Sequence, residues 1–141
     1  MPSLKTFKII DHTGDIGIVM YGGDLRELFL NAGRAFFSLI TYLNRIRSTS
    51  AHTIVLTSDN LDELMVTWLG ELLYLFDAQG MLFKKFDLEE VHTHGLKAVV
   101  RGESFQPERH VIKREIKAVT YHQVKVEKKG EKWEGRIIFD L

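Results

Sequence analysis

The chain has 141 residues, and because 19 Lys and Arg balance 19 Asp and Glu, its formal net charge is zero. The length fits a single domain over residues 1–141, and a content of 45% hydrophobic and 27% charged residues excludes a wholly disordered chain. Zero net charge argues against a general nucleic-acid or membrane coat, which needs a sustained basic surface. The lack of cysteine excludes a disulfide framework, a cysteine nucleophile and a Cys-ligated zinc site.

The lack of cysteine and the length of the apolar runs indicate the cellular compartment. A chain without cysteine suits a reducing compartment. The opening MPSLKTFKII has no apolar run of signal-peptide length, and charges interrupt every apolar stretch well before about 18 residues. We therefore expect a cytoplasmic protein without a membrane span.

Strand patterns open the chain. Short apolar runs at residues 7–10 and 16–21 predict two strands, with the polar segment 11–15 between them. From Asp24 onward the apolar residues recur every three or four positions, as they do on one face of a helix. Asp24 with Glu27 has the form of a capping box, so we expect the first helix to begin there.

The rest of the chain is predicted to contain one more strand and one more helix, followed only by strands. Residues 52–57 predict a third strand, Asn60 begins a second amphipathic helix, and Gly80 is a suitable residue to end it. Four further strands are expected at residues 82–91, 96–102, 116–126 and 132–139. The order β-β-α-β-α-β-β-β-β favours an α+β domain of two layers, with a mixed or mostly antiparallel sheet and both helices packed on one face.

The polar segment Asp11-His12-Thr13-Gly14-Asp15 is the first candidate site. It lies between two predicted strands and contains two carboxylates, which in a short connection can hold a hard cation or a water. Asp and Thr side chains also form local turns. A turn without a ligand is therefore the alternative interpretation of this segment.

The end of the sequence is the second candidate. An apolar strand runs almost to the last residue, so Asp140 and the terminal carboxylate of Leu141 are held by a strand and not by a frayed tail. Two carboxylates in such a place are electrostatically costly unless a cation or a basic group lies near. The alternative is a solvated strand end.

A basic cluster at residues 109–117 is the third candidate, with four Lys or Arg against one Glu. The charge is divided along the chain, because residues 1–80 carry 6 basic and 9 acidic side chains and residues 81–141 carry 13 and 10. Such a cluster could bind phosphate or an acidic partner surface. The alternative is a solvated strand face.

Several segments, taken together, resemble the archease family. They are Asp11-His12-Thr13-Gly14-Asp15-Ile16, Tyr21-Gly22, Asp24-Leu25, Leu64, Trp68-Leu69, Leu72-Leu73, Leu82-Phe83-Lys84-Lys85-Phe86, Gly102-Glu103, Glu115-Ile116-Lys117-Ala118-Val119-Thr120-Tyr121-His122 and Phe139-Asp140-Leu141. Their order and spacing hold from about residue 7 to the final residue. The resemblance therefore covers nearly the whole chain.

The resemblance implies a function that spacing does not show. Archeases are accessory proteins of RtcB-type RNA ligases, which join tRNA halves after intron removal, and they promote the ligase–guanylate intermediate and multiple turnover. We therefore expect a non-catalytic activator of tRNA splicing, and leave open whether it contacts RNA directly. A chaperone-like or specificity role toward a tRNA methyltransferase is also associated with the family and is the alternative. A stand-alone metal-dependent hydrolase is a third hypothesis.

The resemblance also implies a metal site. Asp11, Asp140 and Leu141 match the family's ligands, with calcium (Ca2+) the usual ion and Mg2+ or Mn2+ as other hard cations. Leu141 would contribute a backbone or terminal-carboxylate oxygen. His12 and Asp15 would lie near the ion or beside its ligands. An all-oxygen ligand set suits a hard cation and disfavours zinc or copper.

Two further positions match residues implicated in the family's activity. Asp24 is the acidic one, and Lys117 is the basic one. Because Asp24 also has the form of a helix N-cap, its loss is expected to cost about 1 kcal/mol of stability. Gly14 stands where the family more often has Ala, which makes the loop more permissive.

Overall fold

The computed structural model of the chain describes residues 6–11 and 13–141. The elements follow in the order β1 (Phe7–Asp11), β2 (Asp15–Gly22), α1 (Leu25–Ile40), the short 3₁₀ helix η1 (Leu43–Arg45), β3 (Ser50–Thr57), α2 (Leu61–Gln79), β4 (Met81–His92), β5 (Gly95–Ser104), β6 (Ala118–Lys129) and β7 (Lys132–Asp140). The predicted order of strands and helices and the α+β class are confirmed. Among the described residues, no helix is long and apolar enough to span a membrane.

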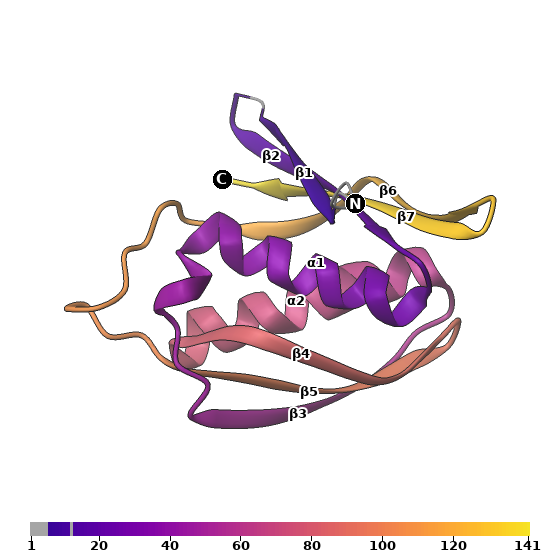
Figure 1. Cartoon of the computed structure of the whole chain (residues 1–141). Coiled ribbons are helices and arrows are strands. Elements are labelled where there is room, and N and C mark those ends of the chain that lie inside the picture. The colour runs from indigo at the N-terminus through magenta and orange to yellow at the C-terminus, as the bar shows by residue number, and fades with distance from the viewer. Residues whose placement is uncertain (1–5, 12) are drawn as a thin grey trace, which may run out of the picture.

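The strands form two sheets where the sequence pattern had indicated one. One sheet has the strand order β1-β2-β7-β6 and the other has the order β3-β5-β4, and all pairings are antiparallel. Figure 1 shows α1 and α2 between the two sheets, which makes three layers. The expected packing of both helices on one face of a single sheet is therefore corrected: α1 contacts β2 on one side and β4 on the other.

The reason lies in how much of each helix is apolar. Helix α1 buries neighbouring residues that face different directions, which is typical of a helix enclosed on two sides. Phe36 lies 5.6 Å from Phe139 of β7, whereas the adjacent Phe37 lies 5.8 Å from Phe83 of β4, measured between ring centroids. The two consecutive aromatic rings thus pack against opposite sheets.

Two contacts fix the helices in the middle layer. A Cβ atom on Gly33 would lie 2.8 Å from Cδ1 of Phe86, so the close approach of α1 to β4 requires glycine there. The fully buried Trp68 of α2 donates its indole N–H to the carbonyl of Phe29 in α1 at 3.0 Å. Helix α2 ends at Gly80, whose φ of 67° places it in the left-handed region that glycine adopts without strain.

Candidate functional site

The first and last parts of the chain meet at one end of the β1-β2-β7-β6 sheet. β2 and β7 are neighbours, and their register places Asp15 directly opposite Asp140. The N–H of Leu141 donates to the carbonyl of Gly14 at 3.2 Å, and the N–H of Lys117 donates to the carbonyl of Asp140 at 2.8 Å. We call this place, formed by residues 11, 14, 15, 117, 140 and 141, the acidic corner.

The register also sorts the carboxylates by face. Asp15 and Asp140 share a face, and it points away from the helices because the next residues along, Ile16 and Phe139, are fully buried. Asp11 is paired with Ile16, so its side chain leaves the sheet on the helix-facing side. Asp15 and Asp140 are therefore neighbours on one face, and Asp11 lies on the other face of the sheet.

The carboxylates of Asp15 and Asp140 face each other without a neutralising positive charge between them among the described residues. Side chains directly opposite on antiparallel strands have Cβ atoms about 4.5–5.5 Å apart, and like charges there destabilise the pairing. Oδ1 of Asp15 is buried and has no hydrogen-bond partner among residues 6–11 and 13–141. A buried carboxylate oxygen without a donor is costly unless a cation neutralises it.

The donors of the acidic corner suit a hard cation. Asp11, Asp15 and Asp140 offer carboxylate oxygens and Leu141 offers main-chain oxygens, the ligand type that Ca2+ and Mg2+ prefer. Within the described part of the chain, no three His, Asp or Glu side chains alone form a metal-binding group. A cation at this corner would therefore need main-chain oxygens, such as those of Leu141, as well as carboxylates. The implied ligand set of Asp11, Asp140 and Leu141 stays a prediction.

Lys117 and His12 are the two remaining residues expected near this site. Lys117 is exposed, and its main chain is bonded to that of Asp140, so the predicted basic residue does belong to the acidic corner. His12 lies outside the residues that the structure describes.

Asp24 is not brought to the acidic corner. It follows the far end of β2, roughly 23 Å along the strand from Asp15. Its carboxylate accepts the N–H of Glu27 at 2.8 Å, and the carboxylate of Glu27 accepts the N–H of Gly23 at 3.1 Å. The observed role of Asp24 is therefore the N-cap of α1, as the capping pattern predicted.

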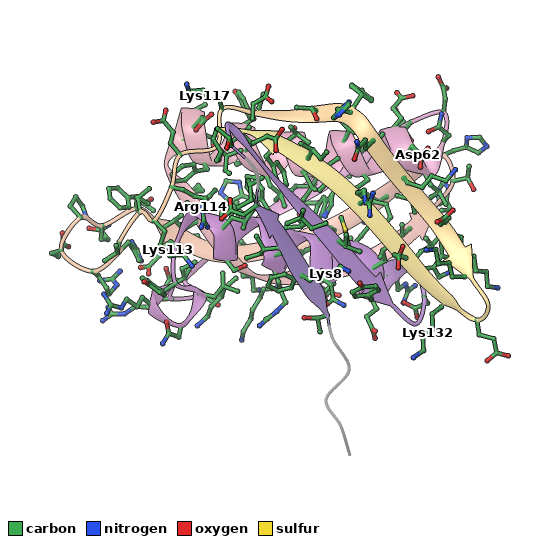
Figure 2. The ribbon with its side chains drawn as sticks, turned by 90° about the horizontal axis from the view of Figure 1, so that it is seen from above. Lys8, Asp62, Lys113, Arg114, Lys117 and Lys132 are labelled. Carbon is green, nitrogen blue, oxygen red and sulfur yellow. The ribbon has the colours of Figure 1, made fainter. Side chains whose placement is uncertain are left out.

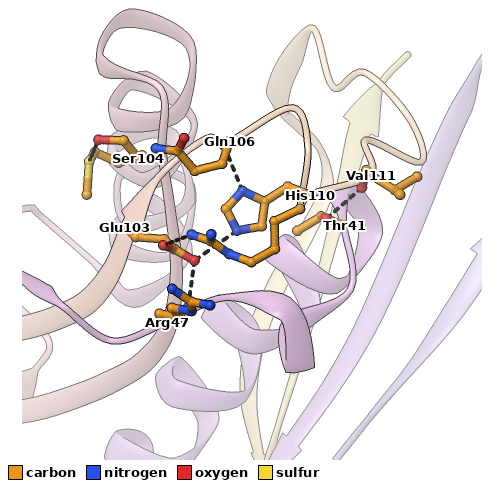
Figure 3. Close-up of polar contacts among 9 residues, drawn as sticks. Thr41, Arg47, Glu103, Ser104, Gln106, His110 and Val111 are labelled. Atoms are coloured by element: carbon orange, nitrogen blue, oxygen red, sulfur yellow. Dashed lines mark hydrogen bonds and ion pairs between the residues drawn. The ribbon is translucent and has the colours of Figure 1, made fainter.

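Sequence reasoning missed a buried polar cluster beside the loop that follows β5 (Figure 3). The Glu103 carboxylate accepts the N–H of Arg47 at 2.7 Å, the guanidinium of Arg109, and a hydrogen bond at 2.9 Å from Nε2 of His110. Nδ1 of His110 accepts the N–H of Gln106 at 2.8 Å, so the proton of the neutral ring lies on Nε2. The sequence signals were the Gly102-Glu103 pair within the resemblance and the basic cluster at residues 109–117, which contains Arg109 and His110.

Glu103 is buried, yet its environment favours the charged form. Burial alone would raise the pKa of this carboxyl, but hydrogen bonds from the Arg47 N–H, His110 and Arg109, together with the charge of Arg109, lower the pKa below its ordinary value. The carboxylate therefore joins the segment after η1 to the loop after β5 as a charged, hydrogen-bonded group.

Comparison with known proteins agrees with this architecture. The model of the Archease protein family (MTH1598/TM1083) matches residues 7–141. Protein archease of Methanosarcina acetivorans is 40% identical over 146 residues, covering 100% of both chains. Protein archease of Pyrococcus abyssi is 33% identical over 142 residues, covering 98% of this chain and 100% of that one.

Solved structures agree as well. The solution structure of Methanobacterium thermoautotrophicum protein 1598 superposes with a TM-score of 0.85 at 33% identity, covering 98% of this chain and 100% of that one. The crystal structure of an archease from Thermotoga maritima, described as a possible chaperone, shares the fold with a TM-score of 0.62 at 22% identity, covering 95% and 96%. The chain therefore belongs to the archease family.

Proposed function

We propose that this archease is a non-catalytic accessory protein of an RtcB-type RNA ligase in tRNA splicing, and that it holds a hard divalent cation, calcium first, at the acidic corner. Family membership over residues 7–141 supports the ligase partner. One observation carries the cation: Oδ1 of Asp15 is buried without a partner among the described residues, directly opposite Asp140.

Each residue of the acidic corner would have its own role: binding the cation, holding the ligands in position, or contacting the partner. A bound cation would neutralise the facing carboxylates and offer a Lewis-acidic centre for phosphate oxygens. The pairing of β2 with β7 holds Asp15 and Asp140 in register, and the hydrogen bond to Gly14 holds the main chain of Leu141 beside them. The exposed Lys117 adds a positive charge that can meet a phosphate or a carboxylate of the partner.

The test is multiple-turnover RNA ligation by the cognate RtcB-type ligase, with the archease added in substoichiometric amounts. We expect the native chain to stimulate turnover and Asp140→Asn to lose the stimulation, because the amide keeps the shape of the side chain but removes its charge. Asp87→Asn is the matched control, since Asp87 is an exposed strand residue of the other sheet. Thermal unfolding of each variant checks that it is folded.

The outcomes separate the parts of the proposal. Equal stimulation by the native chain and by folded Asp140→Asn would remove the acidic corner from the mechanism while keeping the ligase partner. Unchanged ligase turnover with the native chain would overturn the accessory function itself.

The methyltransferase chaperone has less support from the geometry. A chaperone of this kind would need a contiguous exposed apolar surface. The exposed large apolar side chains come from six different segments of the described chain, and they are Ile9, Tyr42, Val55, Tyr74, Val111, Ile112 and Tyr121. Tyr42 lies near Val111 and Ile112, because Thr41 is bonded to Val111 and Lys113 lies over the Tyr42 ring, and the other four lie on four different elements.

A further inference from the structure

The segment from η1 onward, the start of β4 and the loop after β5 lie at one end of the molecule (Figure 1). Their side chains line a basic hollow. It is an open surface depression of about 520 Å3 and not an enclosed cavity. Four lining side chains are basic, Arg45, Arg47, Lys84 and Arg109, against the acidic Glu108. They come from three segments that are distant in sequence, so the fold and not a local charge run makes the hollow.

Buried hydrogen bonds hold the segments that line the basic hollow in place. Buried Glu103 accepts the main-chain N–H of Arg47 and the guanidinium of Arg109, which ties one wall to the other (Figure 3). The hydroxyl of Thr41 donates to the carbonyl of Val111 at 2.6 Å, which fixes the same loop to the end of α1. The site is therefore organised before any ligand arrives.

The charge of the basic hollow is largely uncompensated. Glu103 neutralises Arg109, but among the described residues no carboxylate oxygen lies within 4.0 Å of the side-chain nitrogens of Arg45, Arg47 or Lys84. Nε of Arg109 is also buried without a hydrogen-bond partner among those residues. Because the whole chain has zero net charge, this concentration of positive charge is local.

The positive surface continues past an exposed aromatic ring. Tyr42 is 46% exposed, with Nζ of Lys113 4.6 Å and Cζ of Arg45 5.6 Å from its ring centroid. Figure 2 shows Lys113 and Arg114 together at this end of the molecule. Burial and the neighbouring charge of Arg114 lower the pKa of Lys113, so an anion bound here would relieve the crowding of cations.

We propose that the basic hollow binds phosphate groups of single-stranded RNA, with Tyr42 beside it to stack on a base. Guanidinium groups match phosphate oxygens in bidentate geometry, as Arg45 and Arg47 could provide. Aromatic side chains set among cations are typical of single-strand sites, whereas an acidic peptide has no base to place on the ring. The choice of RNA rests on the proposed function, and the binding of phosphate rests on the basic hollow.

The test measures RNA binding by the archease alone, without ligase. A fluorescently labelled single-stranded RNA of about 12 nucleotides is titrated with the native chain and followed by anisotropy at several salt concentrations. The double variant Arg45→Gln/Arg47→Gln is expected to bind at least about tenfold more weakly and to lower the slope of log K against log salt by about 1.4, as two lost phosphate contacts require. Tyr42→Leu is expected to weaken binding about fivefold or more.

The matched control is Arg26→Gln/Arg136→Gln, which removes the same charge from two exposed arginines outside the basic hollow. It is expected to bind RNA nearly as the native chain does. Both double variants should keep the native unfolding temperature within a few degrees, because the main-chain N–H of Arg47 that holds Glu103 is unchanged. Inorganic pyrophosphate is expected to compete with the RNA.

Three results would overturn the proposal. They are no RNA binding by the native chain, equal losses in the two double variants, and binding of a polyglutamate peptide in place of RNA. Asp140→Asn separates this proposal from the metal-dependent function, because it is expected to lose ligase stimulation and to bind RNA as the native chain does. Failure of RNA binding would likewise leave ligase stimulation unaffected.

Discussion

Glu103 is the residue where burial and charge oppose each other most directly. Its carboxylate accepts hydrogen bonds from the N–H of Arg47, from His110 and from Arg109, which together lower its pKa below the ordinary value. A carboxylate with a lowered pKa in the folded state stabilises the fold above its unfolded pKa of about 4.5. That stabilisation is lost as the pH falls through the folded-state pKa.

This residue therefore predicts a pH dependence of stability. The free energy of unfolding of Glu103→Gln should be lower than that of the native chain by about 2 kcal/mol at neutral pH, as hydrogen bonds to a charged group are worth. The difference should shrink as the pH falls below 4.5, where the carboxyl of the unfolded chain becomes protonated, and it should be lost once the pH is below the lowered pKa of the folded state. Urea unfolding at several pH values measures it, and Glu90→Gln, at an exposed position of β4, is the control. A difference that persists unchanged into acid would contradict the account.

At the scale of elements, the sequence predicts where each helix begins but does not predict which strands pair with one another. Asp24 and Asn60 each accept an N–H three residues later, as the capping patterns predicted, so the helices begin where expected. The pairing of β2 with β7 depends on residues more than a hundred positions apart, so Asp15 could not be placed opposite Asp140 without the fold. The contact between Glu103 and His110 likewise depends on how the loop after β5 folds, so the sequence did not predict it.

The N-cap of α1 allows structural and functional roles of Asp24 to be separated. Asp24→Ala should lower the free energy of unfolding by about 1 kcal/mol, whereas Asp24→Asn should change it by only a few tenths, because the amide oxygen can still accept the Glu27 N–H. Chemical denaturation gives both values. If Asp24→Asn is as stable as the native chain but fails to stimulate the ligase, the charge itself acts on the partner. Equal destabilisation by both substitutions would contradict the role as a cap.

At the scale of the molecule, two sheets enclose two helices, and the first two strands share a sheet with the last two. The alternation of apolar residues indicated strands and helices correctly, but it carries no information on which strands share a sheet. Phe36 and Phe37 pack against opposite sheets, a pattern that a single apolar stripe does not predict. The first sheet joins β1 and β2 to β6 and β7, and this joining creates the acidic corner.

Direct calcium binding tests the central claim most sharply. Isothermal titration of the metal-stripped native chain with Ca2+ should show one site, and saturating Ca2+ should raise the unfolding temperature, by about 10 °C when the ion is at 100 times its Kd. Asp140→Asn should weaken the binding at least about tenfold, while Asp87→Asn should bind as the native chain does. No calcium binding by the native chain, or equal binding by folded Asp140→Asn, would contradict a cation site at the acidic corner.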